Sequence, residues 1–247
     1  MVYMCGSNLE SKGGSAMEDI QEMLAAFPEG QETALLVMTG GSNVEAQSSY
    51  FQTDNAGVYE IASGGRIRKL KDSPSSSNMG DGGTLAAFLR FCQDQRPADH
   101  YALILWNHGG GPLEGVCWDE TGDPDHLTME ELTNALRESL TGKLEWIGFD
   151  ACLMGSLEVA GVLIPYANYM IASQEMEPSF GWNYGFLKEL DPAAGGAQAG
   201  RQIVDAYFSG RENSSEILTL ACIDLGKVDD VIAALDPVFF TAEQDAG

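Results

Sequence analysis

The fold is decided by the stretch Leu144-Glu145-Trp146-Ile147-Gly148-Phe149-Asp150-Ala151-Cys152-Leu153-Met154-Gly155-Ser156. Its first half is a short apolar run, which is typical of a strand buried on both faces of a parallel sheet. Its second half supplies a carboxylate, a thiol and a glycine where that strand ends. The same pattern occurs upstream in Tyr101-Ala102-Leu103-Ile104-Leu105-Trp106-Asn107-His108-Gly109-Gly110-Gly111, which supplies an imidazole. Both stretches predict a buried strand that carries one reactive side chain at its end.

Apolar strands alternate with amphipathic helices along most of the chain. We expect strands at 2–5, 34–38, 101–106, 145–149, 169–172 and 217–222, and helices at 17–27, 85–94, 128–140, 153–165, 198–208 and 228–235. Between 50 and 68, short alternating segments separated by turn residues predict antiparallel strands. The predicted fold class is α/β, with a central mostly parallel sheet covered on both faces and a small antiparallel hairpin insert. No linker-like change of composition divides residues 1–247, so we expect one domain.

The net charge of −24 is the strongest compositional signal. Because nucleic-acid binding needs a basic surface, this charge argues against a nucleic-acid partner. An acidic field attracts cationic ligands, although a solvated acidic surface explains most of such a charge. No apolar run approaches the roughly 18 to 20 residues that span a bilayer, and no export signal precedes the strand at 2–5. We expect the sequence to be trimmed at both ends, so the missing signal says little about the compartment.

The five cysteines form neither a zinc site nor a disulfide framework, because their number is odd and no CxxC pair is present. Cys5, Cys92 and Cys222 lie in apolar surroundings and are expected to be small core residues. With only three histidines in the chain, a metal site would have to use oxygen ligands.

His108 and Cys152 both follow apolar strands, so we expect them at the carboxyl edge of the sheet, where sites of open α/β folds lie. A helix directly after Cys152 would favour the thiolate through its N-terminal amides. Thiolate and imidazole together can attack an amide carbonyl and protonate the leaving amine. The amides of Gly109 and Cys152 are candidates for an oxyanion hole. Taken singly, each residue is also explained by a structural role, as a buried thiol or as a loop cap.

Two motifs carry a resemblance to a known family. Trp106-Asn107-His108-Gly109-Gly110-Gly111 and Phe149-Asp150-Ala151-Cys152-Leu153-Met154-Gly155-Ser156 resemble the clostripain-like family of cysteine peptidases, from the superfamily of caspases, legumain, gingipain and separase. Similar family segments are Tyr3-Met4-Cys5-Gly6-Ser7-Asn8-Leu9-Glu10, Asn78-Met79-Gly80-Asp81 and Ala172-Ser173-Gln174-Glu175-Met176-Glu177-Pro178. The resemblance runs from residue 3 to about residue 190.

The resemblance implies a caspase-like α/β/α sandwich and a His–Cys dyad that cuts after Arg or Lys through a thioester acyl-enzyme. By match, His108 is the general acid or base and Cys152 is the nucleophile. Asp150 matches the acid of the pocket for the residue before the cut, where a carboxylate pairs with a basic side chain. The alternative for Asp150 is a helix N-cap. Glu175, like Glu177, is a candidate to line the same rim, with a solvated face as the alternative.

Other family properties lead to further expectations. No cofactor is required, but some relatives depend on calcium, and the loop around Asp119, Asp123 and Asp125 could hold that ion by oxygen ligation although its spacing is not an EF-hand. Relatives often cut themselves after a basic residue between the His and the Cys. Because 109–136 has no Lys or Arg, we predict little self-cleavage there. The family is largely exported by bacteria, which implies a secreted or cell-envelope protein, and we expect a monomer that acts on peptides or proteins.

Two other classes of function compete with a peptidase. A non-catalytic relative would use the same rim only to bind basic peptides, which the presence of both dyad residues disfavours. A nucleotide-binding α/β protein is suggested by the glycines, but neither G-x-G-x-x-G after the first strand nor G-x-x-x-x-G-K-[ST] occurs.

Overall fold

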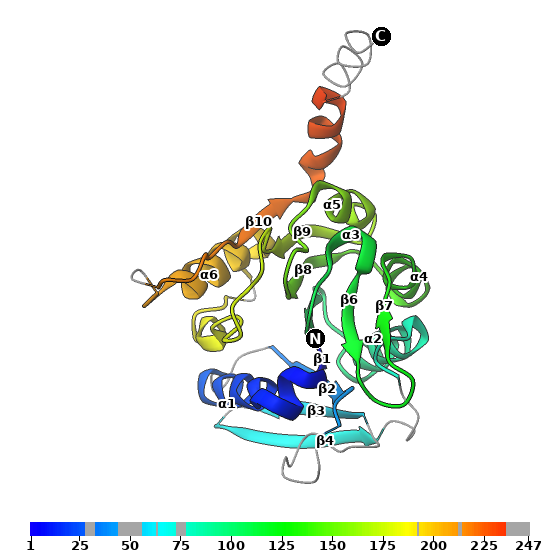
Figure 1. The fold of residues 1–247 in the computed structure, drawn as a ribbon, viewed down its shortest axis with the longest axis vertical. Helices are drawn as coiled ribbons and strands as arrows, with labels where there is room; N and C mark the ends of the chain where they lie inside the picture. The colour runs from blue at the N-terminus through cyan, green and yellow to red at the C-terminus, as the bar shows by residue number, and fades with distance from the viewer. Residues whose placement is uncertain are drawn as a thin grey trace.

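The computed structural model describes residues 1–27, 33–43, 56–62, 64–72, 78–191, 193–211 and 214–235. A sheet of eight strands runs through their centre (Figure 1). The strands are β1 (Val2–Cys5), β2 (Leu35–Gly40), β3 (Gly57–Ala62), β4 (Arg66–Asp72), β5 (Ala102–Trp106), β8 (Leu144–Asp150), β9 (Ala167–Ala172) and β10 (Ala221–Asp224). Their order is β10-β9-β8-β5-β1-β2-β3-β4. The strands from β9 to β2 pair in parallel, whereas β10, β3 and β4 are antiparallel, so the predicted mostly parallel sheet is confirmed.

Helices cover both faces of the sheet, as the alternation of elements predicts. One face carries α1 (Ser15–Ala26), α6 (Gly195–Phe208) and the short helix η2 (Tyr184–Lys188), and the other carries α2 (Gly82–Gln95), α4 (Met129–Ser139) and α5 (Leu157–Leu163) (Figure 1). In β5, Leu103 and Leu105 pack towards α2 and α4, whereas Ile104 and Trp106 pack towards α1 and α6. The shortest helices are η1 (Leu9–Gly13), α3 (Gly111–Glu114) and η3 (Leu225–Lys227), and 228–235 is also helical. None of the helices in the described ranges is long and apolar enough to cross a bilayer.

Three stretches differ from the sequence-based expectation. The hairpin β3–β4 forms, but it extends the central sheet, because β3 pairs with β2. The strand expected at 217–222 begins only at Ala221. The acidic stretch expected as a loop contains two short strands, β6 (Val116–Asp119) and β7 (Asp125–Leu127), which form a separate antiparallel pair. The strand expected at 50–52 lies outside the described residues.

The strand order reverses between β1 and β5, because the chain leaves β1 for β2 on one side and later enters β5 on the other. Ligands of open α/β sheets bind at such a switch, beyond the carboxyl ends of the strands. Parallel pairing sets Met4 opposite Trp106, and Trp106 opposite Asp150. The residues that follow β1, β5 and β8 therefore meet at one point of this edge.

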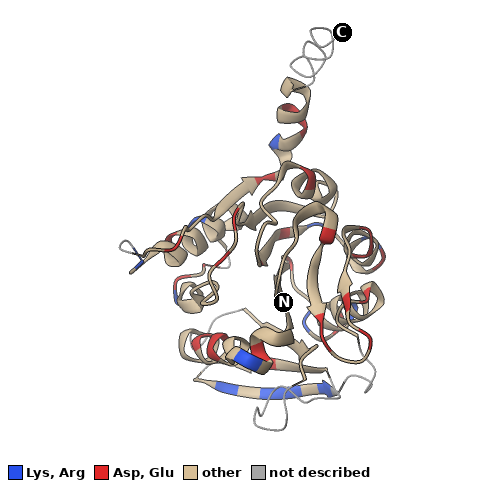
Figure 2. Cartoon of the chain, in the orientation of Figure 1, with Lys and Arg blue, Asp and Glu red and all other residues tan. Residues whose placement is uncertain are grey.

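Charges are placed unevenly on this fold (Figure 2). Basic residues gather on the edge strand β4, which contains Arg66, Arg68, Lys69 and Lys71, whereas α1 is acidic. Charged side chains on an edge strand hinder its pairing with another chain. The basic stripe is therefore explained without a ligand.

Candidate active site

His108 lies two residues beyond the end of β5, at the switch in strand order. Its ring nitrogen Nε2 lies 2.7 Å from Oδ1 of Asn8, in the loop that follows β1. With Nε2–H as the donor of this hydrogen bond, Nδ1 is the nitrogen left to exchange a proton. Burial lowers the pKa of His108, so the ring is neutral at neutral pH and able to accept a proton.

Asn107 fixes the backbone beneath His108. Its Nδ2 donates to the carbonyl of Cys5 at 2.6 Å and to Oγ of Ser7 at 2.7 Å. Its Oδ1 accepts from the backbone N–H of Trp118 at 2.7 Å. Because the Asn107 side chain is buried and fully engaged, it ties β5 to β1 and to β6 and gives His108 a rigid base.

Cys152 lies in a turn between β8 and α5. The prediction that a helix begins directly after it is wrong, because α5 begins at Leu157 with Ser156 as its N-cap. Leu153 has a φ of +62°, a left-handed conformation that turns the backbone away from the strand direction. The sulfur Sγ instead accepts a hydrogen bond of 3.2 Å from the backbone N–H of Glu177, in the loop after β9. That amide, and not a helix N-terminus, is the donor that faces the sulfur.

The two loops that carry His108 and Cys152 touch through their backbones. A Cβ atom at Gly109 would lie 2.1 Å from the carbonyl oxygen of Cys152, so only a glycine permits this approach. The backbone N–H groups of Gly109 and Cys152 donate no hydrogen bond to any described residue. Both amides are therefore free to donate to an oxygen that becomes negatively charged beside the sulfur.

Asp150, the last residue of β8, turns its side chain away from solvent and is only 4% exposed. Its Oδ1 accepts from the backbone N–H of Trp182 at 3.1 Å, and its Oδ2 accepts from the hydroxyl of Tyr184 at 2.9 Å. Burial raises the pKa of Asp150 to about 6. The alternative role as a helix N-cap is wrong, because Ser156 caps α5.

Two further acids lie beside Asp150. Asp19 comes from α1, and its Oδ2 accepts a hydrogen bond of 2.6 Å from the indole Nε1 of Trp106. Burial, and then the charge of Asp150, raise the pKa of Asp19 to about 9. Glu177 contacts the side chain of Asp150, and burial followed by the charge of Asp150 raises its pKa well above its usual value. We call Asp19, Asp150 and Glu177 the carboxyl cluster; within the described residues no ion pair involves any of them.

Of the two glutamates predicted at the rim, Glu177 turns inward and Glu175 does not. Glu175 is exposed, and its backbone carbonyl accepts from the N–H of Leu153 at 3.1 Å. That bond holds the loop after β9 against the turn of Cys152, while the Glu175 carboxylate faces water. The part of Glu175 in substrate binding stays a prediction.

Of the acidic residues considered for calcium, Asp119 and Asp125 lie opposite each other in the β6–β7 pair, but their carboxylates bind other groups. Asp119 is buried and accepts from the backbone N–H of Met79 at 2.7 Å, and Asp125 accepts from Nδ2 of Asn78 at 2.6 Å. Asp123 is exposed. Over the part of the chain that the structure describes, no three His, Cys, Asp or Glu side chains are grouped to hold a metal. A calcium requirement therefore stays a prediction without a residue set.

Among the residues that the structure describes, one cation lies near the carboxyl cluster. Arg211 stacks on Phe180, with 3.9 Å between the guanidinium carbon and the ring centroid. Its Nη1 donates to the carbonyls of Gly181 at 3.2 Å and Tyr207 at 2.9 Å. Burial dominates the pKa of Asp150 and raises it, and the charge of Arg211 opposes that effect only weakly. Arg211 is thus held by carbonyl groups and does not neutralise the cluster.

Sequence reasoning missed two residues of this site. Asp19 lies on the buried stripe of α1 with Ala16, Ile20 and Met23. An acid on an apolar stripe is itself a signal, because a buried carboxyl group needs a specific partner. Asn8 carries no such signal, since only the pairing of β1 with β5 brings it to His108.

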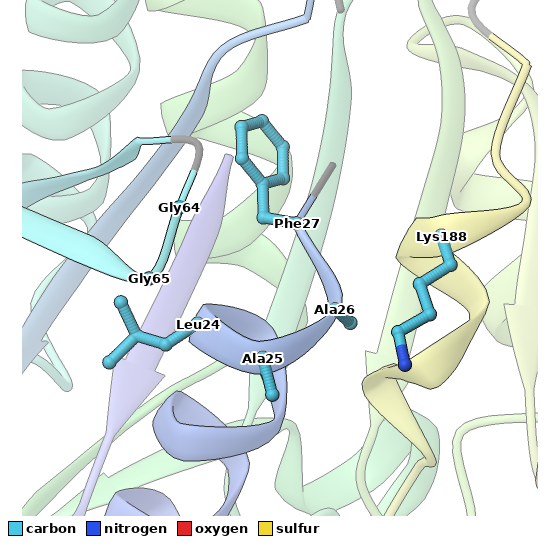
Figure 3. A pocket seen from close by; sticks show the side chains of 7 residues that line it. All are labelled: Leu24, Ala25, Ala26, Phe27, Gly64, Gly65 and Lys188. Atoms are coloured by element: carbon cyan, nitrogen blue, oxygen red, sulfur yellow. The ribbon is translucent and has the colours of Figure 1, made fainter. Parts of the chain in front are cut away.

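Two surface hollows border α1, at its opposite ends. One is lined by Leu24, Ala25, Ala26, Phe27, Gly64, Gly65 and Lys188 (Figure 3). It lies at the end of α1, just before the chain returns to the start of β2, and therefore far from the carboxyl edge of the sheet. The other is lined by Asn8, Leu9, Lys12, Gly13, Ser15, Glu18, Ser179 and Phe180. Through Asn8 it adjoins His108, so it lies beside the switch in strand order.

Comparison with known sequences gives these residues a context. A sequence model of the clostripain family matches residues 2–246. Clostripain from Hathewaya histolytica is 27% identical over 264 residues, which covers 92% of this chain and 48% of that protein. The chain thus spans about half the length of the curated relative that it matches.

Solved structures share the fold. An inactive zymogen C11 protease from Parabacteroides distasonis matches with a TM-score of 0.73 and 21% identity, over 94% of this chain and 63% of that chain. A secreted C11 cysteine protease from Bacteroides thetaiotaomicron, in complex with an irreversible peptide inhibitor, matches with a TM-score of 0.77 and 20% identity, over 94% of this chain and 67% of that chain. The predicted caspase-like α/β/α arrangement is confirmed by these structures.

Proposed function

Because the chain belongs to the clostripain family, we propose that it is a cysteine endopeptidase that cuts peptide bonds after arginine or lysine. Cys152 is the nucleophile, and His108 is the general base and then the general acid. One observation supports this most: a half-buried thiol, an oriented imidazole and two backbone N–H groups without a partner among the described residues lie on adjoining loops at the same edge of the sheet. These are the groups that acyl transfer from a peptide bond requires.

The reaction proceeds through two tetrahedral intermediates. His108 takes the proton of the Cys152 thiol, and Sγ forms a bond to the carbonyl carbon of the substrate. The carbonyl oxygen gains the negative charge and accepts from the N–H groups of Gly109 and Cys152. When the C–N bond breaks, His108 gives its proton to the leaving amine and a thioester remains. A water molecule, deprotonated by His108, then attacks the thioester, and the thiol takes back its proton as the acid product leaves.

Asp150 selects the side chain before the cut. Its carboxyl group is buried two residues before the nucleophile, and the hydrogen bonds from Trp182 and Tyr184 hold it in place. A guanidinium or ammonium group is the natural partner of a buried carboxylate. The net charge of −24 also favours basic substrates by attraction at longer range.

The setting of this activity is also part of the proposal. Its substrates are peptides or proteins, as the peptide inhibitor bound to the Bacteroides thetaiotaomicron protease supports for that relative. That relative is a secreted protein, which supports export for this chain as well. We further propose that the protein acts as a monomer.

Hydrolysis of matched fluorogenic peptides tests the proposed function. Peptides with Arg, Lys or Ala before the cut are compared for wild type, Cys152→Ala and, as a matched control, Cys222→Ala, whose half-buried thiol lies on the edge strand β10. We expect cleavage after Arg and Lys by wild type and Cys222→Ala, and none by Cys152→Ala. Unchanged cleavage by Cys152→Ala contradicts the mechanism, and a preference for Ala removes Asp150 from the pocket. Binding of basic peptides without any cleavage by wild type identifies a non-catalytic relative.

Self-cleavage offers a second check. The only Arg or Lys residues between His108 and Cys152 are Arg137, which lies within α4, and Lys143, which is exposed just before β8. We predict that active protein shows no cut between 109 and 136 after prolonged incubation. Mass spectrometry of the incubated protein measures this, and a fragment that ends in that interval contradicts it.

A further inference from the structure

Unpaired polar atoms gather beside the Cys152 turn. Six buried side-chain nitrogen or oxygen atoms have no hydrogen-bond partner within the described ranges, and four of them are Oε1 and Oε2 of Glu177, Nε1 of Trp182 and the hydroxyl of Tyr207. Buried polar groups in folded proteins are nearly always paired, so each exception needs an explanation. Their concentration at one place indicates a partner from outside the chain.

Glu177 is the least explained of these groups. An ionised carboxylate accepts hydrogen bonds and donates none. Glu177 contacts the carboxyl group of Asp150, so two ionised groups could form no hydrogen bond with each other. This contact becomes a hydrogen bond only when one of the two acids holds a proton. The hydroxyl of Tyr184 and the backbone N–H of Trp182 already bond to Asp150, and the indole N–H of Trp182, which faces Glu177, can serve only one of its two oxygens. The pair therefore needs either a proton or a cation.

The surroundings of the pair leave its charge uncompensated. The titratable groups that act on it are Asp19 of α1, Cys152, Tyr184 of η2, Tyr207 of α6 and Arg211, while Glu18 and Glu22 of α1 act on Asp19. Arg211 is the one cation among them, and its Nη1 is engaged with two carbonyl groups. Without a ligand, a second negative charge in this buried place is strongly unfavourable, and a proton prevents it.

We propose that Glu177 is the second acid of the pocket for the basic side chain, and that it shares with Asp150 one proton that leaves when this side chain enters. The proposal rests on the proposed function and specifies how its pocket recognises charge. A guanidinium carries five N–H donors, which suit the unpaired oxygens of Glu177 and Tyr207. The O–H bond of the protonated acid breaks, its electron pair stays on the carboxylate, the proton passes to the solvent, and no bond between heavier atoms changes. The ligand brings one positive charge as the proton removes one.

This exchange makes binding depend on pH. Because the free pair holds a proton that the complex does not hold, a higher pH favours the complex. The affinity for a basic peptide rises by at most about tenfold per pH unit for one released proton. The rise ends at the pH where the free pair has already lost its proton.

Calorimetry measures the proton directly. A peptide that ends in Arg is titrated into Cys152→Ala protein at pH 7 in phosphate and in Tris, whose heats of ionisation differ. We expect the difference in heat to correspond to roughly half to one proton released, as linkage requires for a group that loses its proton on binding. Repeating the titration at pH 6 and pH 8 should show tighter binding at the higher pH.

Two further variants, both combined with Cys152→Ala, locate the proton. In Glu177→Gln the side-chain amide donates to Asp150, so Asp150 is ionised without a ligand; we expect the proton release to fall towards zero and the affinity to fall about tenfold to a hundredfold. Glu138→Gln is the matched control, because Glu138 is exposed near the end of α4, which leads to the opposite edge of the sheet. We expect Glu138→Gln to keep both the affinity and the proton release.

The outcomes separate this proposal from the proposed function. Proton release in the parent and in Glu138→Gln, lost in Glu177→Gln, supports the shared proton. If the Arg peptide binds tightly with equal heats in the two buffers, no proton is released. The proposal of a shared proton is then wrong, while the proposed peptidase function is unaffected. An Arg peptide that binds no better than its Ala counterpart overturns both. The comparison of buffers needs only the parent protein, so it remains decisive if Glu177→Gln does not fold.

Discussion

The polar groups on the two sides of the Cys152 turn differ in their exposure to solvent. On one side, the His108 ring and the Cys152 thiol are half-buried and have hydrogen-bond partners in Asn8 and the Glu177 amide. On the other side, the carboxyl groups of Asp150 and Glu177 are buried and face each other, and neither forms an ion pair with any residue that the structure describes. The reacting groups need access and orientation, whereas the acids that recognise charge gain strength from the loss of water. Substitution of a reacting group should therefore lower the rate for every substrate, whereas substitution of an acid should lower the preference for a basic side chain.

His108→Ala is expected to have the largest effect. Without the general acid and base, kcat/KM should fall by about 10² to 10⁴ for every substrate, whatever its side chain. Steady-state hydrolysis of the Arg and Lys peptides measures the loss. The matched control is His100→Ala, because His100 is exposed and precedes the same strand at its other end. Near wild-type activity of His108→Ala would remove the imidazole from the mechanism.

Asp150→Asn should have the next largest effect. Loss of one charge-assisted interaction with the substrate lowers kcat/KM for Arg peptides by about 10², while Ala peptides change little. Asp205→Asn, which removes an exposed acid from α6, serves as the control and should behave as wild type. An equal loss for Arg and Ala peptides would show that Asp150 acts in catalysis and not in recognition of the basic side chain.

Asn8→Ala tests how far His108 depends on its orientation. Because one neutral hydrogen bond contributes about 0.5 to 1.5 kcal/mol, kcat should fall by roughly threefold to tenfold. The Arg to Ala preference should stay the same, since the carboxyl cluster is untouched. Asn168→Ala, on the exposed side of β9, is the control. A change in preference instead of rate would show that Asn8 contacts the substrate.

Asp19→Asn should change stability more than activity. Burial raises the pKa of Asp19 to about 9 in the folded state, above about 3.9 in the unfolded chain. The stability gained from its proton is therefore full at low pH and is lost as pH rises through about 9. Thermal unfolding between pH 5 and 9 should show a Tm that falls with pH less steeply in Asp19→Asn than in wild type. Parallel curves for the two proteins would contradict a protonated Asp19.

The fold and the pair of His108 and Cys152 could be predicted from the sequence. The runs Tyr101–Trp106 and Leu144–Phe149 lack alternation because both faces of β5 and β8 are covered, and such runs predict central parallel strands. Since parallel strands end at one edge, His108 and Cys152 could be placed together. The turn after Cys152 could not be predicted, because the left-handed Leu153 is not a glycine and α5 begins four residues later than that leucine.

The carboxyl cluster depends on contacts that are distant in sequence. Asp19 reaches the site because α1 packs over β5, where Trp106 donates to it. Glu177 and Glu175 look alike in sequence, and bonds that form only in the folded chain, from Leu153 N–H to the Glu175 carbonyl and from Glu177 N–H to Cys152 Sγ, hold them in different orientations. The stretch that contains β6 and β7 is predicted as a loop because aspartate is rare in strands. The carboxylates of Asp119 and Asp125 are instead paired with backbone and side-chain donors.

The most direct test is the ratio of kcat/KM for two peptides that differ only in Arg or Ala before the cut, measured for wild type, His108→Ala and Asp150→Asn. If chemistry and charge recognition lie on separate sides of the Cys152 turn, His108→Ala keeps the wild-type ratio while both values fall. Asp150→Asn, in contrast, brings the ratio close to one. A ratio close to one in His108→Ala, or a wild-type ratio in Asp150→Asn, would contradict that separation.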